Sequence, residues 1–410
     1  MQREAECVGS VDCHDWVLKL CCLNRHGLVT ALSNGKIDVI PFGQTSKATE
    51  INAHDGAVNS VRMIDENNCC SCGNDGVVKI WDLRAPTGRN CTSVMEGVKG
   101  LPFVSLDAHD TLIGAGTELR GDSHLFIWDR KRLDVPFKQF TECHQDDITE
   151  VRFHPTRRNM LLSGSTDGYV NVYNLKAEKE EDALLQVINF ASVHSANFLP
   201  DDKLYTLSHM ETFGVHSLID TTTEESVESD PVVYGDIREK WDCEYVVDVY
   251  APGYVCCGSN SAKQLHLYQF QPRSVDFGSL AKKAQSISLP GAHGDEIVRD
   301  VNIHNGVIYT GGEDGLVKMW NVAGYNLENT SSRFFGDEDS SSSTKKRHHH
   351  HDQHHRAKKH AESIADAGTG HTHHSKRHKK HDDSHHHHHH HRGHYKSSRF
   401  MPYSRPANHD

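Results

Sequence analysis

The sequence has no apolar run that approaches the roughly 18 residues needed to cross a membrane. Its first residues, MQREAECVGSVDCHDW, do not contain the basic segment followed by an apolar one that marks a secretory signal. We therefore expect a soluble, intracellular protein without a membrane partner.

Sequence motifs of nucleotide-dependent and hydrolytic enzymes are also missing. No G-x-x-x-x-G-K phosphate loop occurs, and Gly114-Ala115-Gly116 lacks the strand-to-helix context of a dinucleotide site or a nucleophile elbow. Cys69 and Cys72 form a C-x-x-C without a second pair at zinc-site spacing, so packing is expected rather than metal binding. The sequence predicts a protein that is not an enzyme, uses no cofactor and holds no metal in its body.

One pattern recurs along the chain. Its clearest copy, residues 54–82, has short stretches of alternating apolar residues separated by a turn at Asn74-Asp75-Gly76. Period-two alternation with a glycine-bounded turn is typical of an antiparallel meander with one buried face. Residues 144–174 and 293–321 repeat the plan, and the opening His and closing aromatic are 27, 29 and 27 residues apart. Because so short a meander cannot bury its apolar face alone, the copies must stack.

These copies resemble WD repeats, whose four-stranded blades recur about every 40 to 45 residues. In that family a His before the first strand, a Ser or Thr, the turn Asp and a Trp form a hydrogen-bonded chain within each blade. The matching sets are His54, Ser71, Asp75 and Trp81; His144, Ser163, Asp167 and Tyr173; and His293, Thr310, Asp314 and Trp320. A buried turn carboxylate is costly unless it accepts several hydrogen bonds, so we interpret these sets as structural rather than catalytic.

Weaker copies fill the gaps between the clear ones. Each copy closes on one residue of its third strand, at intervals of 41 to 52 residues. The closing residues are Ile40, Trp81, Trp128, Tyr173, His216, Tyr268 and Trp320. The sequence thus predicts an all-β, seven-bladed WD-repeat propeller over residues 1–327; six blades would require dismissing the first or fifth copy. Since an unpaired edge strand invites aggregation, residues 4–11 are expected to complete the last blade, with residues 322–327 as the alternative.

Charge divides the chain into two parts. Residues 345–410 carry 14 Lys and Arg against 6 Asp and Glu, a net charge of +8. Because the whole chain has a net charge of −12, residues 1–344 carry a net charge of −20. An acidic body repels phosphate, so direct nucleic-acid binding is not expected of it. Residues 328–410 contain almost no apolar side chains, and 21 of the 34 His follow residue 344. We predict a disordered, low-complexity, His/Lys/Arg-rich C-terminal tail.

Three interpretations of this tail stay open. Lys345-Lys346-Arg347 and residues 376–380 resemble signals read by import receptors, or weak contacts to nucleic acid. Clustered imidazoles bind metal ions at neutral pH, which suggests a metal-binding role. The third interpretation is a solvated extension without a specific partner.

A closer resemblance appears in residues 114–118, 144–155, 180–184 and 236–239, which look like the WD repeat-containing protein 89 family. The similarity covers roughly residues 15 to 325. Membership implies a eukaryotic scaffold in the nucleus, with the cytoplasm as a second location.

The most economical interpretation is a non-catalytic scaffold for protein–protein interactions in a nuclear complex. Its binding surface is expected where the loops between blades and the inner turns gather, on a mostly acidic rim suited to basic segments of partner proteins. The rim candidates are Asp146, Asp147, Glu211, Asp236, Arg238, Asp295, Glu296 and Arg299. The alternative for each residue is an ordinary solvated loop charge.

The alternative is a substrate receptor of a cullin-type ubiquitin ligase. Residues 81–84 (WDLR) and 128–131 (WDRK) resemble the W-D-x-R/K boxes of such receptors. The resemblance implies that Arg84 and Lys131 dock on the ligase adaptor.

Overall fold

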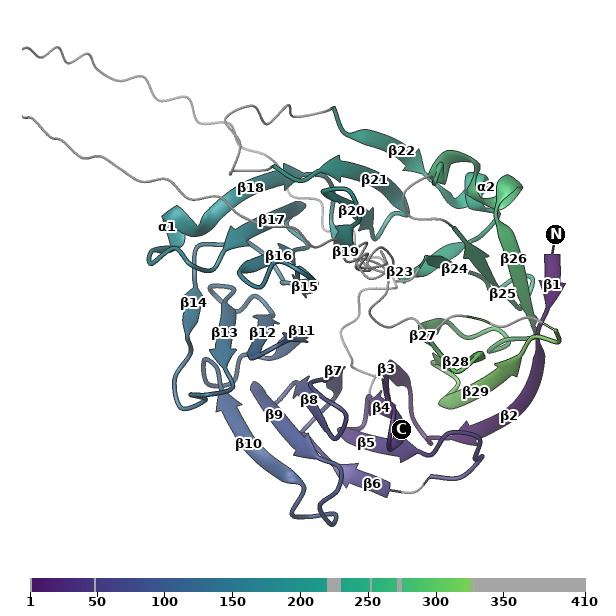
Figure 1. The fold of residues 1–410 in the computed structure, drawn as a ribbon, viewed down its shortest axis with the longest axis horizontal. Helices are drawn as coiled ribbons and strands as arrows, with labels where there is room; N and C mark the ends of the chain where they lie inside the picture. Colours follow the sequence, from purple (N-terminus) through teal and green to yellow (C-terminus); the bar gives the residue numbers. More distant parts are fainter. Residues whose placement is uncertain are drawn as a thin grey trace, which may run out of the picture. The chain divides into compact units, whose positions relative to one another are not determined.

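The computed structural model describes residues 2–47, 49–219, 230–250, 253–270, 275–324 and 327. Their strands form seven separate sheets, which Figure 1 shows as blades arranged around a central channel. The predicted seven-bladed propeller is confirmed. The tail predicted for residues 328–410 lies outside the described residues.

Each blade is an antiparallel meander that runs from the channel outward. Blade one contains β3 (Val17–Leu23), β4 (Gly27–Leu32), β5 (Lys36–Ile40) and β6 (Thr49–Asn52); blade two contains β7 (Val58–Met63), β8 (Asn68–Gly73), β9 (Val77–Asp82) and β10 (Cys91–Glu96). Blade three contains β11 (Phe103–His109), β12 (Leu112–Thr117), β13 (Leu125–Asp129) and β14 (Lys138–Phe140); blade four contains β15 (Glu150–Phe153), β16 (Met160–Gly164), β17 (Tyr169–Asn174) and β18 (Leu184–Asn189).

The remaining blades follow the same order. Blade five contains β19 (Val193–Leu199), β20 (Lys203–Ser208), β21 (Thr212–Ser217) and β22 (Val232–Asp236), and blade six contains β23 (Tyr245–Tyr250), β24 (Tyr254–Ser259), β25 (Gln264–Gln269) and β26 (Gln285–Pro290). Blade seven contains β27 (Val298–His304), β28 (Val307–Gly312), β29 (Leu316–Asn321) and, from the other end of the chain, β2 (Glu6–Asp12). Short helices lie in the connections: α1 (Glu180–Ala183), α2 (Arg238–Trp241), the 3-10 turn η1 (Phe277–Ser279) and α3 (Leu280–Lys283).

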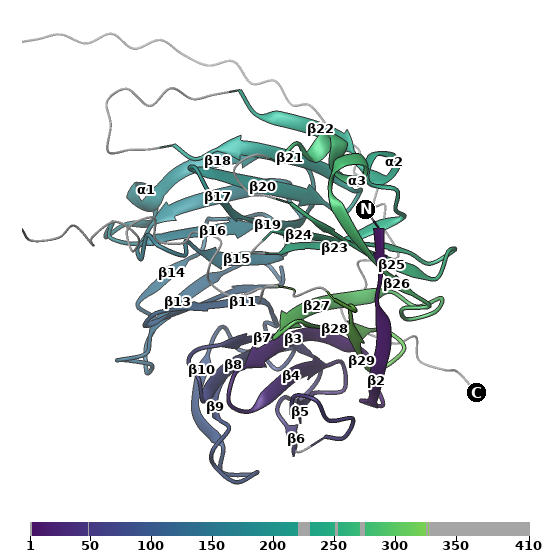
Figure 2. The same ribbon diagram turned by 45° about the vertical axis from the view of Figure 1, so that its right-hand side comes forward.

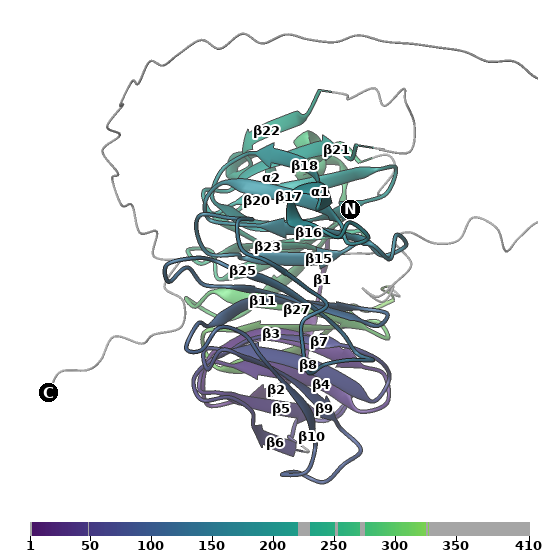
Figure 3. The same cartoon turned by 90° about the vertical axis from the view of Figure 1, so that its left-hand side faces the viewer.

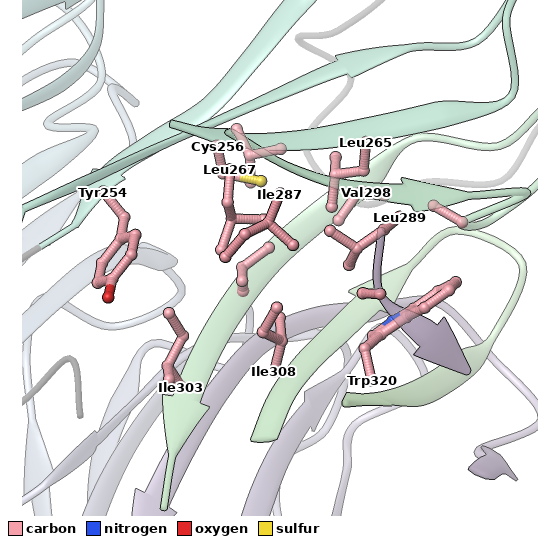
Figure 4. Packing of buried hydrophobic residues seen from close by; sticks show 14 of the residues in the cluster. Tyr254, Cys256, Leu265, Leu267, Ile287, Leu289, Val298, Ile303, Ile308 and Trp320 are labelled. Atoms are coloured by element: carbon pink, nitrogen blue, oxygen red, sulfur yellow. The ribbon is translucent and has the colours of Figure 1, made fainter. Parts of the chain in front are cut away.

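Apolar side chains between neighbouring sheets hold the ring together. Figure 4 shows the cluster between blades six and seven, where Leu267 and Ile287 face Ile303 and Ile308. Burying one such side chain stabilises the fold by about 1.5 to 3 kcal/mol. The sheets lie face to face with their neighbours (Figure 3), so each blade buries the surface that a lone meander would expose.

The N-terminal segment completes two blades. β2 pairs antiparallel with β29, with Val11 opposite Val317, so the predicted use of residues 4–11 is confirmed. The alternative is wrong, because Val322 and Leu327 pack instead into the apolar cluster between blades six and seven. One feature was not predicted: β1 (Gln2–Glu4) adds to β26 in parallel, which makes blade six a five-stranded sheet. Figure 2 shows β1 and β2 as one continuous ribbon along the outside of blades six and seven.

The loops on one side of the disc are joined from blade to blade. The loop before each innermost strand meets the turn between the second and third strands of the preceding blade, as where Ala53 and His54 donate backbone hydrogen bonds to the Gly35 carbonyl. Gly35 has φ +85°, and a Cβ there would lie 2.3 Å from the His54 carbonyl oxygen, so only glycine fits. We call this side, formed by the loops before the innermost strands and the turns between second and third strands, the loop face.

Among the described residues no helix is long and apolar enough to span a bilayer.

Candidate functional site

The His, Ser, Asp and Trp of blade two form one continuous hydrogen-bonded chain. The indole Nε1 of Trp81 donates to Ser71 Oγ over 2.8 Å, and Ser71 Oγ lies 2.7 Å from His54 Nε2. His54 Nδ1 lies 2.8 Å from Asp75 Oδ1. With Ser71 donating to Nε2 and Nδ1 donating to the carboxylate, a neutral imidazole satisfies every group.

This order of hydrogen bonds is the same as in a Ser-His-Asp triad, and burial decides between the two roles. Ser71 has no exposed surface and its oxygen already accepts from Trp81, so no substrate carbonyl can reach it. Burial lowers the pKa of His54 although Asp75 opposes it. Burial alone raises the pKa of Asp75, but the hydrogen bonds from His54 and the Asp55 N–H, together with nearby positive charge, outweigh it and the net pKa is lowered. The pair is therefore a carboxylate beside a neutral imidazole.

Blades four and seven contain the same arrangement. His144 lies 3.0 Å from Asp167 and 2.7 Å from Ser163, while the Tyr173 ring stacks on Phe140 at 4.9 Å instead of supplying an indole donor. In blade seven, His293 lies 2.6 Å from Asp314 and 2.8 Å from Thr310, which accepts from Trp320 over 3.0 Å.

The turn carboxylates also fix the loop face. Asp75 Oδ2 accepts the backbone N–H of Asp55 over 3.2 Å, and Asp167 Oδ2 accepts that of Gln145 over 2.8 Å. Each carboxylate thus binds the loop before the innermost strand to the turn of its own blade. We propose that the three sets act as a scaffold for the loop face.

Glu211 differs from its predicted place on the exposed rim. Its side chain is 3% exposed and accepts the Val246 backbone N–H over 3.2 Å, so it joins blade five to blade six. In the same blade His216 stands where blades two, three and seven have Trp, and its Nε2 lies 2.9 Å from Thr206 Oγ1. The side chain of Glu211 is one methylene longer than that of Asp, so its carboxylate reaches the neighbouring blade. The turn pattern alone did not predict this contact.

The acidic pair Asp146 and Asp147 is half-buried at the junction of blades three and four. Asp147 accepts the Leu119 N–H over 2.8 Å and so holds the turn between β12 and β13 of blade three. Burial, together with the nearby charges of Asp146 and Glu118, raises the pKa of Asp147 to about 6.

The other rim candidates lie at the junctions of blades five to seven. Asp236 and Arg238 are exposed and pair with each other, with Arg238 Nε 3.0 Å from Asp236 Oδ1, and this pairing lowers the pKa of Asp236. Asp295 is exposed and lies 3.1 Å from Lys263 Nζ, and Glu296 is exposed beside it. Arg299 donates to Glu313 within the turn of blade seven. Arg238, Lys263 and Arg299 are therefore each paired with a nearby carboxylate. Glu296 is the exposed carboxylate of this group for which no ion pair is seen among the described residues.

The two W-D-x-R/K boxes lie on the opposite side of the disc from the loop face, after the third strands of blades two and three. Arg84 is exposed and folds back on Asp82, at 2.9 and 2.7 Å, which lowers the pKa of Asp82 to about 2. Lys131 is exposed, and its backbone N–H donates to Asp129 over 3.0 Å.

A network of charges on the innermost strands was not predicted. Arg152 Nε lies 2.8 Å from Glu150 Oε2, and Asp248 accepts from Ser195 over 2.6 Å and lies 3.8 Å from Arg152. Asp107 accepts the Phe153 N–H over 2.8 Å, so the carboxylates bridge neighbouring blades. One signal could have found it: Arg62, Asp107 and Arg152 follow one another at a constant interval of 45 residues.

A cavity of about 250 Å³ lies where strands β3, β7, β11 and β27 end. Arg62 and Asp107 line it, 3.7 Å apart, together with Asn24, Asn302 and His304. Among the described residues no three His, Cys, Asp or Glu side chains come together as metal ligands.

Comparison with known proteins agrees with the geometry of the blades. The family described as WD domain, G-beta repeat matches residues 45–82, 136–174 and 284–321. An uncharacterised WD repeat-containing protein of Saccharomyces cerevisiae is 40% identical over 316 residues, which cover 75% of this chain and 78% of the relative. The chain belongs to the WD repeat-containing proteins.

Two further relatives refine this assignment. The WD repeat-containing protein 89 homolog of Dictyostelium discoideum is 26% identical and covers 76% of this WD-repeat chain and 86% of its own length, so the predicted resemblance is confirmed. The DDB1- and CUL4-associated factor 10 of Danio rerio is 26% identical over 150 residues, which are 35% of this chain and 28% of the relative.

Proposed function

We propose that this WD-repeat propeller is a non-catalytic interaction scaffold in a nuclear complex and that its loop face binds basic segments of partner proteins. The observation that carries the proposal is the exposure of Asp295 and Glu296, with Asp146 half-exposed, on loops fixed from blade to blade by backbone hydrogen bonds. Burial of Ser71, Ser163 and Thr310 supports the non-catalytic part. Complementary charge of this kind steers encounter and sets partner choice.

The test is affinity purification of the full chain from nuclear extract, compared by mass spectrometry with a chain lacking residues 328–410. A second comparison uses a loop-face variant with Asp146→Asn, Asp295→Asn and Glu296→Gln. We expect the full chain to co-purify with proteins that contain basic segments, and we expect the loop-face variant to lose these proteins. Recovery of the same partners by both would contradict it.

A second candidate function is that of a substrate receptor for a cullin-type ubiquitin ligase. It is supported by partial similarity to a protein named as DDB1- and CUL4-associated, and by the exposure of Arg84 and Lys131. Arg84 must leave Asp82 to meet an adaptor, which costs little because water screens an ion pair at the surface of the protein. Unchanged co-purification of DDB1 with Arg84→Ala and Lys131→Ala would rule this function out.

The proposed nuclear import signals lie in the C-terminal tail. We expect Lys345-Lys346-Arg347 and residues 376–380 to bind import receptors, so that alanine at these Lys and Arg positions moves the protein to the cytoplasm. A metal-binding role instead expects that removal of residues 345–410 abolishes zinc or nickel tolerance while the propeller stays folded.

A further inference from the structure

The cavity at the ends of the innermost strands has one guanidinium and one carboxylate on its wall. It measures about 250 Å³ and lies on the side of the disc opposite the loop face, where β27, β3, β7 and β11 end. These four strands are neighbours around the channel (Figure 1). Arg62 comes from β7 and Asp107 from β11, and their side chains are 20% and 18% exposed. Both groups are therefore within reach of a ligand that enters the cavity.

Both groups are fixed, and each keeps a polar atom for a ligand. Asp107 Oδ2 accepts the Phe153 N–H over 2.8 Å, and Arg62 Nη1 donates to the Val61 carbonyl over 3.3 Å. Arg62 Nε is buried without an acceptor, because Asp107 Oδ1 lies 3.7 Å away, too far for a hydrogen bond. Within the described part of the chain, Arg62 Nη2 donates no hydrogen bond and Asp107 Oδ1 accepts none. The cavity thus offers one donor and one acceptor side by side.

The rest of the wall carries no charge. Leu20, Val61 and Ile303 are apolar and buried. Burial lowers the pKa of His304, which is therefore a neutral imidazole, and burial raises the pKa of Cys21 to about 12, so this thiol keeps its proton. The single guanidinium and the single carboxylate cancel each other. Because a net charge is costly to bury without a partner, a neutral ligand is favoured.

A primary carboxamide matches this pair of groups. Its carbonyl oxygen accepts and its NH₂ donates, and one carbon holds both, so the oxygen can face Arg62 Nη2 while the nitrogen faces Asp107 Oδ1. A carboxylate would be repelled by Asp107, and an ammonium group would be repelled by Arg62. A trans secondary amide, such as a peptide bond, holds its N–H and its carbonyl on opposite sides and cannot face both groups at once.

We propose that this cavity binds a primary carboxamide, either that of a small molecule or that of an Asn or Gln side chain of a partner protein. Arg62 donates to the carbonyl oxygen, Asp107 accepts from the amide nitrogen, and the apolar wall encloses the carbon chain of the ligand. The cavity and the loop face lie on opposite sides of the disc. The proposal therefore stands independently of the function proposed above.

The experiment measures the binding of three small probes to the full chain by saturation-transfer NMR titration. The probes are butanamide, N-methylbutanamide and butanoate. We expect butanamide to bind about tenfold more tightly than the other two, since each of these leaves a polar group of the site without its partner. Equal affinities for the three probes, or no saturation transfer to butanamide, would overturn the proposal.

Asp107→Asn tests the acceptor directly. The amide oxygen of the new side chain can keep the Phe153 N–H, while its NH₂ replaces the acceptor of the site by a second donor. We expect the variant to bind butanoate more tightly than butanamide, which reverses the preference of the wild type. Asp110→Asn is the matched control, because this carboxylate lies outside the cavity and pairs with Arg158. A preference for butanamide that survives in Asp107→Asn would contradict the assigned roles.

A last comparison separates the two sources of the carboxamide. An acetylated Gly-Gln-Gly peptide with an N-methylamide end presents the same group on a polypeptide. Tighter binding of this peptide than of butanamide assigns the cavity to a partner side chain, and binding of butanamide alone assigns it to a small molecule. Arg62→Met removes the donor at similar side-chain length and should abolish the binding of both probes. Binding that persists in Arg62→Met, with an unchanged thermal midpoint, would overturn the proposal.

Discussion

A hydrogen-bonded chain of serine, histidine and aspartate occurs in blades two and four, and blade seven has the same chain with Thr310 in place of the serine. In each blade an aromatic side chain at the end of the third strand packs beside the set. In blade two the indole of Trp81 occupies the Ser71 oxygen that a substrate would need. The role of a residue therefore depends on what covers it as much as on its neighbours in a motif. Residue identities alone predicted the sets, but only burial separates a scaffold from a triad.

The first prediction at this scale concerns Asp75. Asp75→Ala leaves His54 Nδ1 and the Asp55 N–H without their acceptor, which should lower the free energy of unfolding by about 2 kcal/mol. Asp55→Ala is the matched control, because this neighbouring carboxylate is exposed and should cost less than about 0.5 kcal/mol. Urea unfolding measures both, and equal losses would argue against the structural role of Asp75.

The second concerns pH. Burial lowers the pKa of His216 to about 4 from its ordinary 6.5, so the unfolded chain binds the proton first as pH falls. The full stability is therefore present above pH 6.5 and is lost toward pH 4, by about 1 to 2 kcal/mol at pH 5 for this residue. Urea midpoints at pH 7 and pH 5 should differ less for His216→Gln than for wild type. His154, whose pKa burial also lowers to about 4, remains in both proteins and serves as the internal reference.

At the scale of the element, the N-terminal strand is decisive because it joins the two ends of the chain. Val11 of β2 is 4% exposed in the cluster with Val317 and Met319, whereas Val8 in the same strand is 54% exposed. Val11→Asp should unfold blade seven, since an unpaired buried carboxylate costs several kcal/mol. Val8→Asp should leave the thermal midpoint nearly unchanged. Hydrogen exchange of β29 amides reports which strand is released, and protection in both variants would contradict the account.

Elements with regular alternation were predictable, and those that depend on distant partners were not. The seven third strands were found from the spacing of their closing residues, which is a local pattern. β2 was found because the unpaired edge strand of the last blade had to be covered. The parallel addition of β1 to β26 had no local signal, since three residues carry no periodicity. The hydrogen bond from the Val246 N–H to Glu211 also had no local signal, because it depends on where the next blade places that amide.

At the scale of the whole molecule, the ring places carboxylates of different blades on one face. Asp146 and Asp295 are far apart in sequence, and only closure of the propeller brings their loops to the same side. Sequence predicted the excess of acidic charge, but the pairing of Asp236 with Arg238 and of Asp295 with Lys263 could not be seen without coordinates. A partner is therefore expected to respond to the electrostatic potential of all the loop-face charges together, rather than to a single residue.

The most direct measurement is the affinity of the full chain for a synthetic lysine-rich peptide at several salt concentrations. The loop-face variant, Asp146→Asn, Asp295→Asn and Glu296→Gln, is compared with an opposite-face variant of equal charge, Glu66→Gln, Asp134→Asn and Glu178→Gln, all three of them exposed loop residues. The account predicts a Kd about tenfold higher for the loop-face variant, since the three surface charges each contribute about 0.5 kcal/mol to the attraction of the peptide. The difference should become smaller as the salt concentration rises. Equal affinities for the two variants would contradict it.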